Sequence, residues 1–164
     1  MTIQGNSAST GNTATNSNLI FKVGDSGATT AMTILNNGNV GIKKADPTAD
    51  LHVNGALVIV PVALTDAATI ATDASTGNIF TVSITGDQTL AVPTNPTDGQ
   101  KCVWRVTASG ANRTLTLASG PGGFRFGTTI TALTIITSGK TDYIGAIYNS
   151  TAGYWDVVAY SKGF

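Results

Sequence analysis

The chain has 164 residues, with nine basic and nine acidic side chains and a formal net charge of zero. Charged residues make up 11% of it, less than half of the roughly 25% usual in soluble proteins. With Lys43-Lys44 as the one basic pair, this balance excludes the electrostatic footprint of a nucleic-acid-binding protein. All nine acids are Asp, and Thr occurs 27 times and Gly 19 times. Such a composition favours strands and turns over long surface helices, so we expect an all-β fold.

Residues 1–18 form the first of three regions and consist almost entirely of small polar residues. A segment of this composition cannot bury enough apolar surface to order itself. We expect an extended anchoring arm that another copy or another protein holds, with Ile3 as a candidate contact. The arm lacks the basic and apolar stretches of a signal peptide, so we expect assembly in a cytoplasm and no secretion by such a peptide.

Residues 19–60 alternate short apolar clusters with Gly, Asn and Asp, and Asn37-Gly38 is a strong tight-turn signal. Strands of three to five residues form little core within one chain. We therefore expect a short shaft-like segment in which identical chains intertwine as a homotrimer. The candidate contacts are the apolar residues of these clusters: Leu19, Ile20, Phe21, Val40, Ile42, Leu51 and Val53.

Residues 61–164 show the two-residue alternation of half-buried strands, most clearly from Phe80 to Ile84 and from Cys102 to Thr107. About seven or eight short strands at 8–12-residue spacing predict an antiparallel β-sandwich or jelly-roll-like domain. One of them is expected over residues 130–137, and a short helix over residues 66–73. The apolar run at residues 56–64 is about half of a membrane span, so no membrane segment is expected.

The residues that carry catalytic chemistry are few. His52 is the only histidine and Cys102 the only cysteine, so neither a zinc ligand set nor a nucleophile with its base is predicted. Cys102 alternates with apolar residues and is expected in the core. Most carboxylates stand in turn contexts, where Asp caps its own backbone. We expect no enzyme, no catalytic residue and no cofactor or metal, although the sequence leaves calcium binding by a loop acid open.

Aromatic side chains near the C-terminus are the best candidates for ligand binding, because amphipathic rings suit sugar and protein surfaces. By strand parity, Tyr154, Asp156 and Tyr160 share one face, and Trp155 faces the core with Val157. We interpret the two tyrosines and Asp156 as a possible contact for a host-surface glycan.

The segment Gly38-Asn39-Val40-Gly41-Ile42, followed by Asp46-Pro47 and Leu51-His52-Val53, resembles one that recurs in bacteriophage tail-fibre and related virion proteins. There it lies between a fibrous shaft and a distal head, and Lys43-Lys44 departs from its usual pattern. Residues 61–164 look more loosely like β-domains of phage particle proteins. The resemblance implies a homotrimeric particle component without catalytic residues.

These expectations combine into a bacteriophage virion structural protein on the virion surface. The arm, residues 1–18, would grip the major capsid protein or another virion protein, and the β-domain, residues 61–164, would point outward. A capsid decoration (cement) protein or short head fibre fits this length better. The alternative is a short tail fibre or receptor-binding tip that recognises a host-surface glycan.

Overall fold

The computed structural model describes residues 18–164, and the chain divides into two compact units, residues 1–58 and 59–164. Strands make up 44% of the fold. The described residues contain no α-helix, only two 3-10 turns, η1 (Asp25–Gly27) and η2 (Ala74–Thr76). The expectation of a mostly β protein is confirmed. The helix expected over residues 66–73 is wrong, because a short strand and its flanking loops occupy that stretch.

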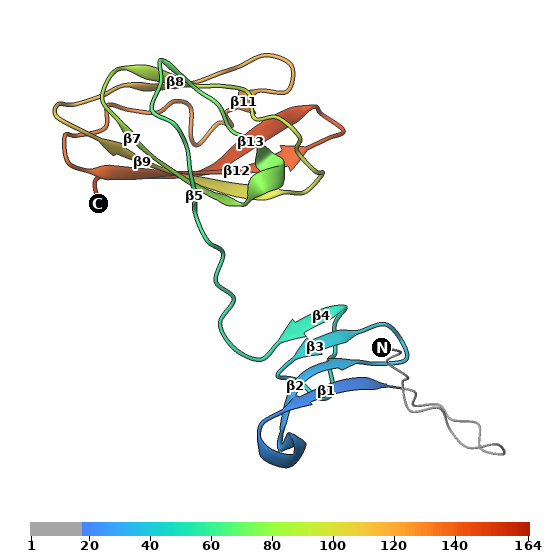
Figure 1. The fold of residues 1–164 in the computed structure, drawn as a ribbon. Helices are drawn as coiled ribbons and strands as arrows, with labels where there is room; N and C mark the ends of the chain where they lie inside the picture. The colour runs from blue at the N-terminus through green and yellow to red at the C-terminus, as the bar shows by residue number, and fades with distance from the viewer. Residues whose placement is uncertain (1–17) are drawn as a thin grey trace. The chain divides into compact units, whose positions relative to one another are not determined.

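The first unit contains one four-stranded sheet of order β1-β2-β3-β4, called here the N-terminal sheet (Figure 1). Its strands are β1 (Leu19–Val23), β2 (Thr29–Ile34), β3 (Val40–Ile42) and β4 (Leu51–Val53). The β1–β2 and β2–β3 pairs are antiparallel, whereas β3 and β4 are parallel and are joined by the loop of residues 43–50. Strands β1 and β4 are therefore the two edges, and both run in the same direction.

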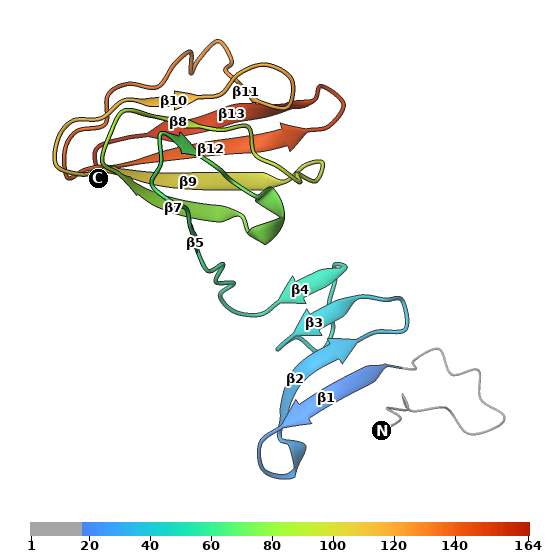
Figure 2. The same ribbon diagram turned by 45° about the horizontal axis from the view of Figure 1, so that its top comes forward.

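The second unit contains two sheets. The six-stranded sheet has the order β11-β13-β12-β9-β7-β5, and the three-stranded sheet has the order β10-β8-β6 (Figure 2). Their strands are β5 (Val62–Ala63), β6 (Thr69–Ile70), β7 (Ile79–Ile84), β8 (Gln88–Leu90), β9 (Lys101–Ala108), β10 (Leu115–Leu117), β11 (Phe124–Arg125), β12 (Thr141–Asn149) and β13 (Tyr154–Ser161).

Consecutive strands from β5 to β10 alternate between the two sheets. After each strand the chain crosses to the other sheet and returns, so that neighbouring strands of one sheet run parallel. Only the pairs made by β12, with β13 and with β9, are antiparallel in this unit. The antiparallel pairing expected for this domain is thus wrong. Residue alternation identifies a strand with one buried face, but it does not say which sheet the strand joins.

Both sheets contribute to a single core of 18 buried apolar residues, all of which lie in the second unit. Trp104 is fully buried at its centre, edge-on to Phe124 and Trp155 at 5.3 and 5.7 Å between ring centroids. Its indole N–H donates to Thr72 Oγ1 at 3.1 Å. This hydrogen bond gives a partner to a donor that would otherwise be buried without one. The expected core positions of Trp155 and Cys102 are confirmed, since each is at most 1% exposed.

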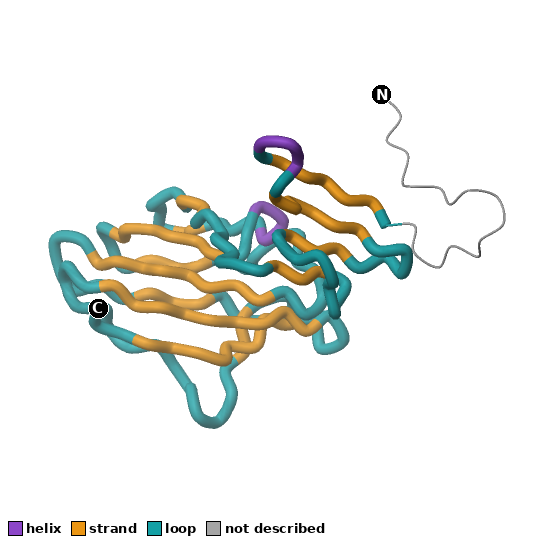
Figure 3. The backbone as a smooth tube through the Cα atoms, turned by 90° about the horizontal axis from the view of Figure 1, so that it is seen from below, coloured by secondary structure: helices purple, strands orange, loops and turns teal. Residues whose placement is uncertain are grey.

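The strand expected over residues 130–137 is absent. That stretch is irregular except for one bridge between Ile136 and Arg113. Loops and turns, teal in Figure 3, likewise connect the strands elsewhere in the fold. Ile136 still fills the core at 2% exposure, so the apolar signal there reflects burial of a loop side chain and not a strand.

Candidate functional site: an uncovered apolar sheet face

One face of the N-terminal sheet carries two rows of apolar residues. The strand register aligns two rows across all four strands, because residues opposite each other in neighbouring strands project to the same side. These rows are Leu19–Ile34–Val40–Leu51 and Phe21–Met32–Ile42–Val53. We call these eight residues the apolar face. The row between them, Ile20–Thr33–Gly41–His52, projects to the opposite side.

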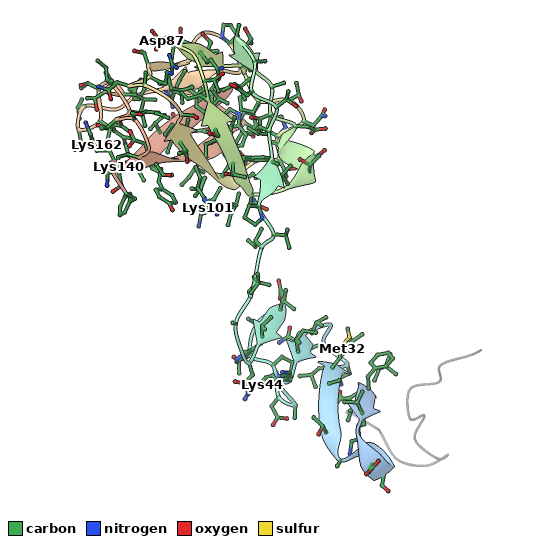
Figure 4. All side chains as sticks on the ribbon, turned by 60° about the vertical axis from the view of Figure 1, so that its left-hand side comes forward. Met32, Lys44, Asp87, Lys101, Lys140 and Lys162 are labelled. Carbon is green, nitrogen blue, oxygen red and sulfur yellow. The ribbon has the colours of Figure 1, made fainter. Side chains whose placement is uncertain are left out.

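The loop between β3 and β4, residues 43–50, covers that opposite side. Asn39 Nδ2 donates to the carbonyl of Pro47 at 3.2 Å, and Thr48 Oγ1 lies 3.3 Å from His52 Nδ1. The loop passes so close to β3 that a Cβ at Gly41 would overlap the carbonyl oxygen of Lys44, and only glycine fits there. Figure 4 shows Met32 and Lys44 on opposite sides of the sheet.

The apolar face has no such cover within the described part of its unit. The only buried residues among 18–58 are Thr33, Gly41 and Pro47. Exposure is greatest at the two edges, where Leu51 of β4 is 60% and Phe21 of β1 is 37% exposed. Contiguous exposed apolar surface on a soluble protein often marks an interaction site. Here the loop covers the less apolar side of the sheet and leaves the more apolar side exposed. This arrangement is typical of a surface that another protein surface covers.

The sequence-predicted contacts divide between the two sides. Six of them belong to the apolar face: Leu19, Phe21, Val40, Ile42, Leu51 and Val53. Ile20 projects to the opposite side, and Ile3 lies outside the described residues. Sequence reasoning missed Met32 and Ile34 of β2 as members. Their two-residue spacing around Thr33 is the signal that would have found them.

An apolar linker follows this sheet. Leu57, Val58 and Val60 are 73, 80 and 77% exposed, and Ile59 is 41% exposed. Residues 55–61 make no backbone–backbone hydrogen bond within the part of the chain that the structure describes. Four successive large apolar residues with free backbone groups indicate a second surface that favours burial.

A separate polar cluster lies on the six-stranded sheet, where β11 runs beside β13. Arg125 Nε donates to Asp156 Oδ1 at 2.7 Å and Nη2 donates to Oδ2 at 3.0 Å, a two-pronged pair on the surface. The guanidinium carbon also lies 5.1 Å from the ring centroid of Tyr154. A planar ring beside a fixed cation and carboxylate can hold a hydroxyl-rich ligand by stacking and hydrogen bonds.

Tyr160 does not join this cluster, so the prediction that it shares a face with Tyr154 and Asp156 is wrong. The β12–β13 register shifts between Gly145 and Ala146, which leaves Val158 as an extra residue. A bulge of this kind reverses the alternation beyond it. Tyr160 therefore packs against the core, and its hydroxyl donates to the buried Asp142 Oδ2 at 2.8 Å. Burial raises the pKa of the Tyr160 phenol above its usual value.

Three further carboxylates of the second unit accept hydrogen bonds. Of these, only Asp73 caps its own turn, as predicted from its context, whereas Asp98 and Asp66 accept from residues distant in the sequence. Asp73 Oδ1 accepts from Ser75 N at 3.0 Å, and Asp98 Oδ1 accepts from Ser150 N at 2.8 Å. Hydrogen bonds from Ser75 and Ser150 lower the pKa values of these two carboxyls. Thr85 and Gln88 donate to Asp66, and the Thr85 bond contributes most to the lowered pKa of that carboxyl. These groups stabilise loops and present no acid–base pair.

The described residues contain no cluster of His, Cys and carboxylates able to hold a metal ion. Burial raises the pKa of the Cys102 thiol to about 11, so it is a poor nucleophile at neutral pH. His52 lies in the other unit, against Thr48. Among residues 18–164, no helix has the length and apolar character needed to cross a membrane.

The second unit also has an open groove of about 530 Å³ beside the edge strands β5 and β6. Small apolar and threonine side chains line it, and Asp73 is its one ionisable residue. Because Asp73 is already engaged by Ser75 and Asn95, the groove offers no free charge to a ligand.

No family model, curated protein or solved structure matches this chain. The functional argument therefore rests on the residues and on their geometry.

Proposed function

We propose that the chain is a homotrimeric bacteriophage virion structural protein: a capsid decoration (cement) protein or short head fibre. The observation that carries this proposal is the apolar face, which residues 18–58 leave open on one side of a sheet whose other side is covered by its own loop. A sheet with an exposed apolar face of this kind gains stability when a further surface covers it.

The two units suit different tasks in such a component. The N-terminal sheet and the linker provide apolar surface for association, which corresponds to a short shaft-like segment. The second unit has its own complete core and needs no partner to fold, as an outward-facing domain requires. A chain with zero net charge and 11% charged residues also packs many copies closely with little mutual repulsion.

The arm, residues 1–18, is proposed to attach the trimer to the major capsid protein or another virion protein. Its small polar residues suit an extended segment that gains order from the surface it binds. Removing residues 1–18 should leave a folded trimer that no longer associates with particles. Undiminished incorporation would contradict this role.

The alternative is a short tail fibre or receptor-binding tip. Arg125, Tyr154 and Asp156 favour it, because they place a ring, a cation and a carboxylate side by side on the surface of the second unit. The copy number on purified particles separates the two positions. Hundreds of copies per particle support decoration of the shell, whereas a few dozen or fewer support the tail.

A further inference from the structure

We infer that the N-terminal sheets of three copies join head to tail, with β4 of each copy pairing in parallel with β1 of the next, into a closed ring with the apolar face inside. This inference rests on the proposed function and identifies the partner of the apolar face as further copies of this chain. The arguments are the position of the apolar rows, the directions of the edge strands and the area available.

The apolar rows run from one edge of the sheet to the other. They begin with Leu19 and Phe21 on β1 and end with Leu51 and Val53 on β4, and exposed apolar surface is greatest at these ends. β1 is also a five-residue edge strand of sequence LIFKV. Apolar edge strands with free backbone groups are templates for further pairing. A cover must therefore protect both edges as well as the face.

Strand direction permits the two edges to meet. β1 and β4 run the same way because two antiparallel pairs and one parallel pair separate them. Rotation about an axis parallel to the strands keeps that direction. It therefore sets β4 of one copy beside β1 of the next as parallel neighbours. Leu51 then continues to Leu19 of the next copy, and Val53 continues to Phe21, so both rows become continuous around the ring.

The area of the apolar face argues against a simple pair of stacked sheets. Four strands spaced about 4.8 Å apart, over the three residues of about 3.3 Å each that the rows span, give the face a footprint of about 190 Å². A stable two-copy contact buries about 800 Å² per partner. Stacking two sheets covers one footprint and leaves all four edges open. Pairing β1 with β1 extends the sheet and leaves the face open. A head-to-tail ring covers face and edges together, and a ring of three copies is the one that corresponds to the proposed homotrimer.

The test uses the full-length chain with Ile20→Cys and His52→Cys combined. Both positions lie on the side of the sheet away from the apolar face, so the substitutions leave the proposed contact intact. In the ring, Ile20 of one copy lies opposite His52 of the next, at the spacing of adjacent strands, which a disulfide can bridge. The native Cys102 is buried and has a raised thiol pKa, so it takes no part.

After oxidation, the double variant should migrate as a covalent trimer without reductant, and each single variant should migrate as a monomer. A trimer by mass in which Ile20→Cys alone forms covalent dimers would overturn the ring, because β1 would then pair with itself. A trimer in which the double variant stays unlinked would overturn it as well. A chain that is monomeric by mass would instead contradict the proposed function.

Hydrogen exchange on the unmodified chain gives a second test that needs no substitution. In the ring, the amides of β1 and β4 that point away from the sheet are paired and should exchange slowly. Rapid exchange at either edge in a trimer would also overturn the inference.

Discussion

Replacing Ile42 with Asp tests the role of the apolar face. Ile42 lies on β3 between Met32 and Val53 in one of the two rows. In an isolated chain this side chain is not fully buried, so a carboxylate there keeps part of its hydration. In an assembly that covers the face, the same carboxylate loses its water without gaining a partner. The substitution should therefore weaken association far more than it weakens folding of the chain.

The magnitude follows from the burial that is lost. Burying a fully exposed Ile side chain contributes about 1.5 to 3 kcal/mol. Ile42 is already mostly buried in the isolated chain, so covering the rest contributes about 0.7 kcal/mol per copy and about 2 kcal/mol per trimer. That loss alone lowers the association constant by a factor of about 30. Desolvation of three unpaired carboxylates adds to it. At micromolar concentration the Ile42→Asp chain should sediment as a monomer.

The matched control is Ile20→Asp, the same chemical change on the opposite side of the same sheet, where the side chain is 49% exposed. This variant should remain a trimer. Both tryptophans lie in the second unit, so their fluorescence reports whether that unit stays folded in each variant. An Ile42→Asp chain that remains trimeric, or two variants that dissociate equally, would refute the role of the apolar face.

Three further predictions concern other parts of the chain. Gly41→Ala forces a Cβ against the Lys44 carbonyl and should destabilise the N-terminal sheet by about 1 to 3 kcal/mol. Faster amide hydrogen exchange in β2 and β3 would verify this loss of stability, and unchanged exchange would contradict it. The pKa of Asp73 in the folded chain is lowered chiefly by a hydrogen bond from Ser75. The stability that this carboxylate contributes is therefore complete above its pKa in the unfolded chain, about 3.9. It is lost as the pH falls through the lower pKa of the folded chain. Melting temperatures between pH 6 and pH 3 should thus fall less steeply for Asp73→Asn than for the native chain, and equal slopes would argue against the effect. Tyr154→Ala should cost about 1 kcal/mol of stability or less, and loss of particle adsorption to host cells in this variant would favour the receptor-binding alternative over decoration.

The sequence predicts most of the strands because each has one face toward a core or a covered surface. The clusters at residues 19–23, 40–42 and 51–53 match β1, β3 and β4, and the alternation around Trp104 matches β9. The pairing was not predictable in the same way. Parallel neighbours such as β7 and β9 are separated by β8, which belongs to the other sheet, and no local residue pattern encodes that crossing.

The candidate sites also depend on strand pairing that local residue patterns do not encode. Six apolar residues of residues 19–60 could be selected by hydropathy, but only the register of four paired strands places them on one side and sends Ile20 to the other. Parity failed for Tyr160 because it assumes an unbroken strand, and Val158 interrupts β13. Arg125 was missed as the partner of Asp156 because the two residues stand 31 positions apart.

Sedimentation equilibrium of the purified full-length chain tests self-association through the N-terminal sheet most directly. One chain has a mass of 16.7 kDa. The proposed trimer predicts a single species of three times that mass, about 50 kDa, that persists on dilution to low micromolar concentration. A stable species of 16.7 kDa, with the N-terminal sheet folded, would contradict it.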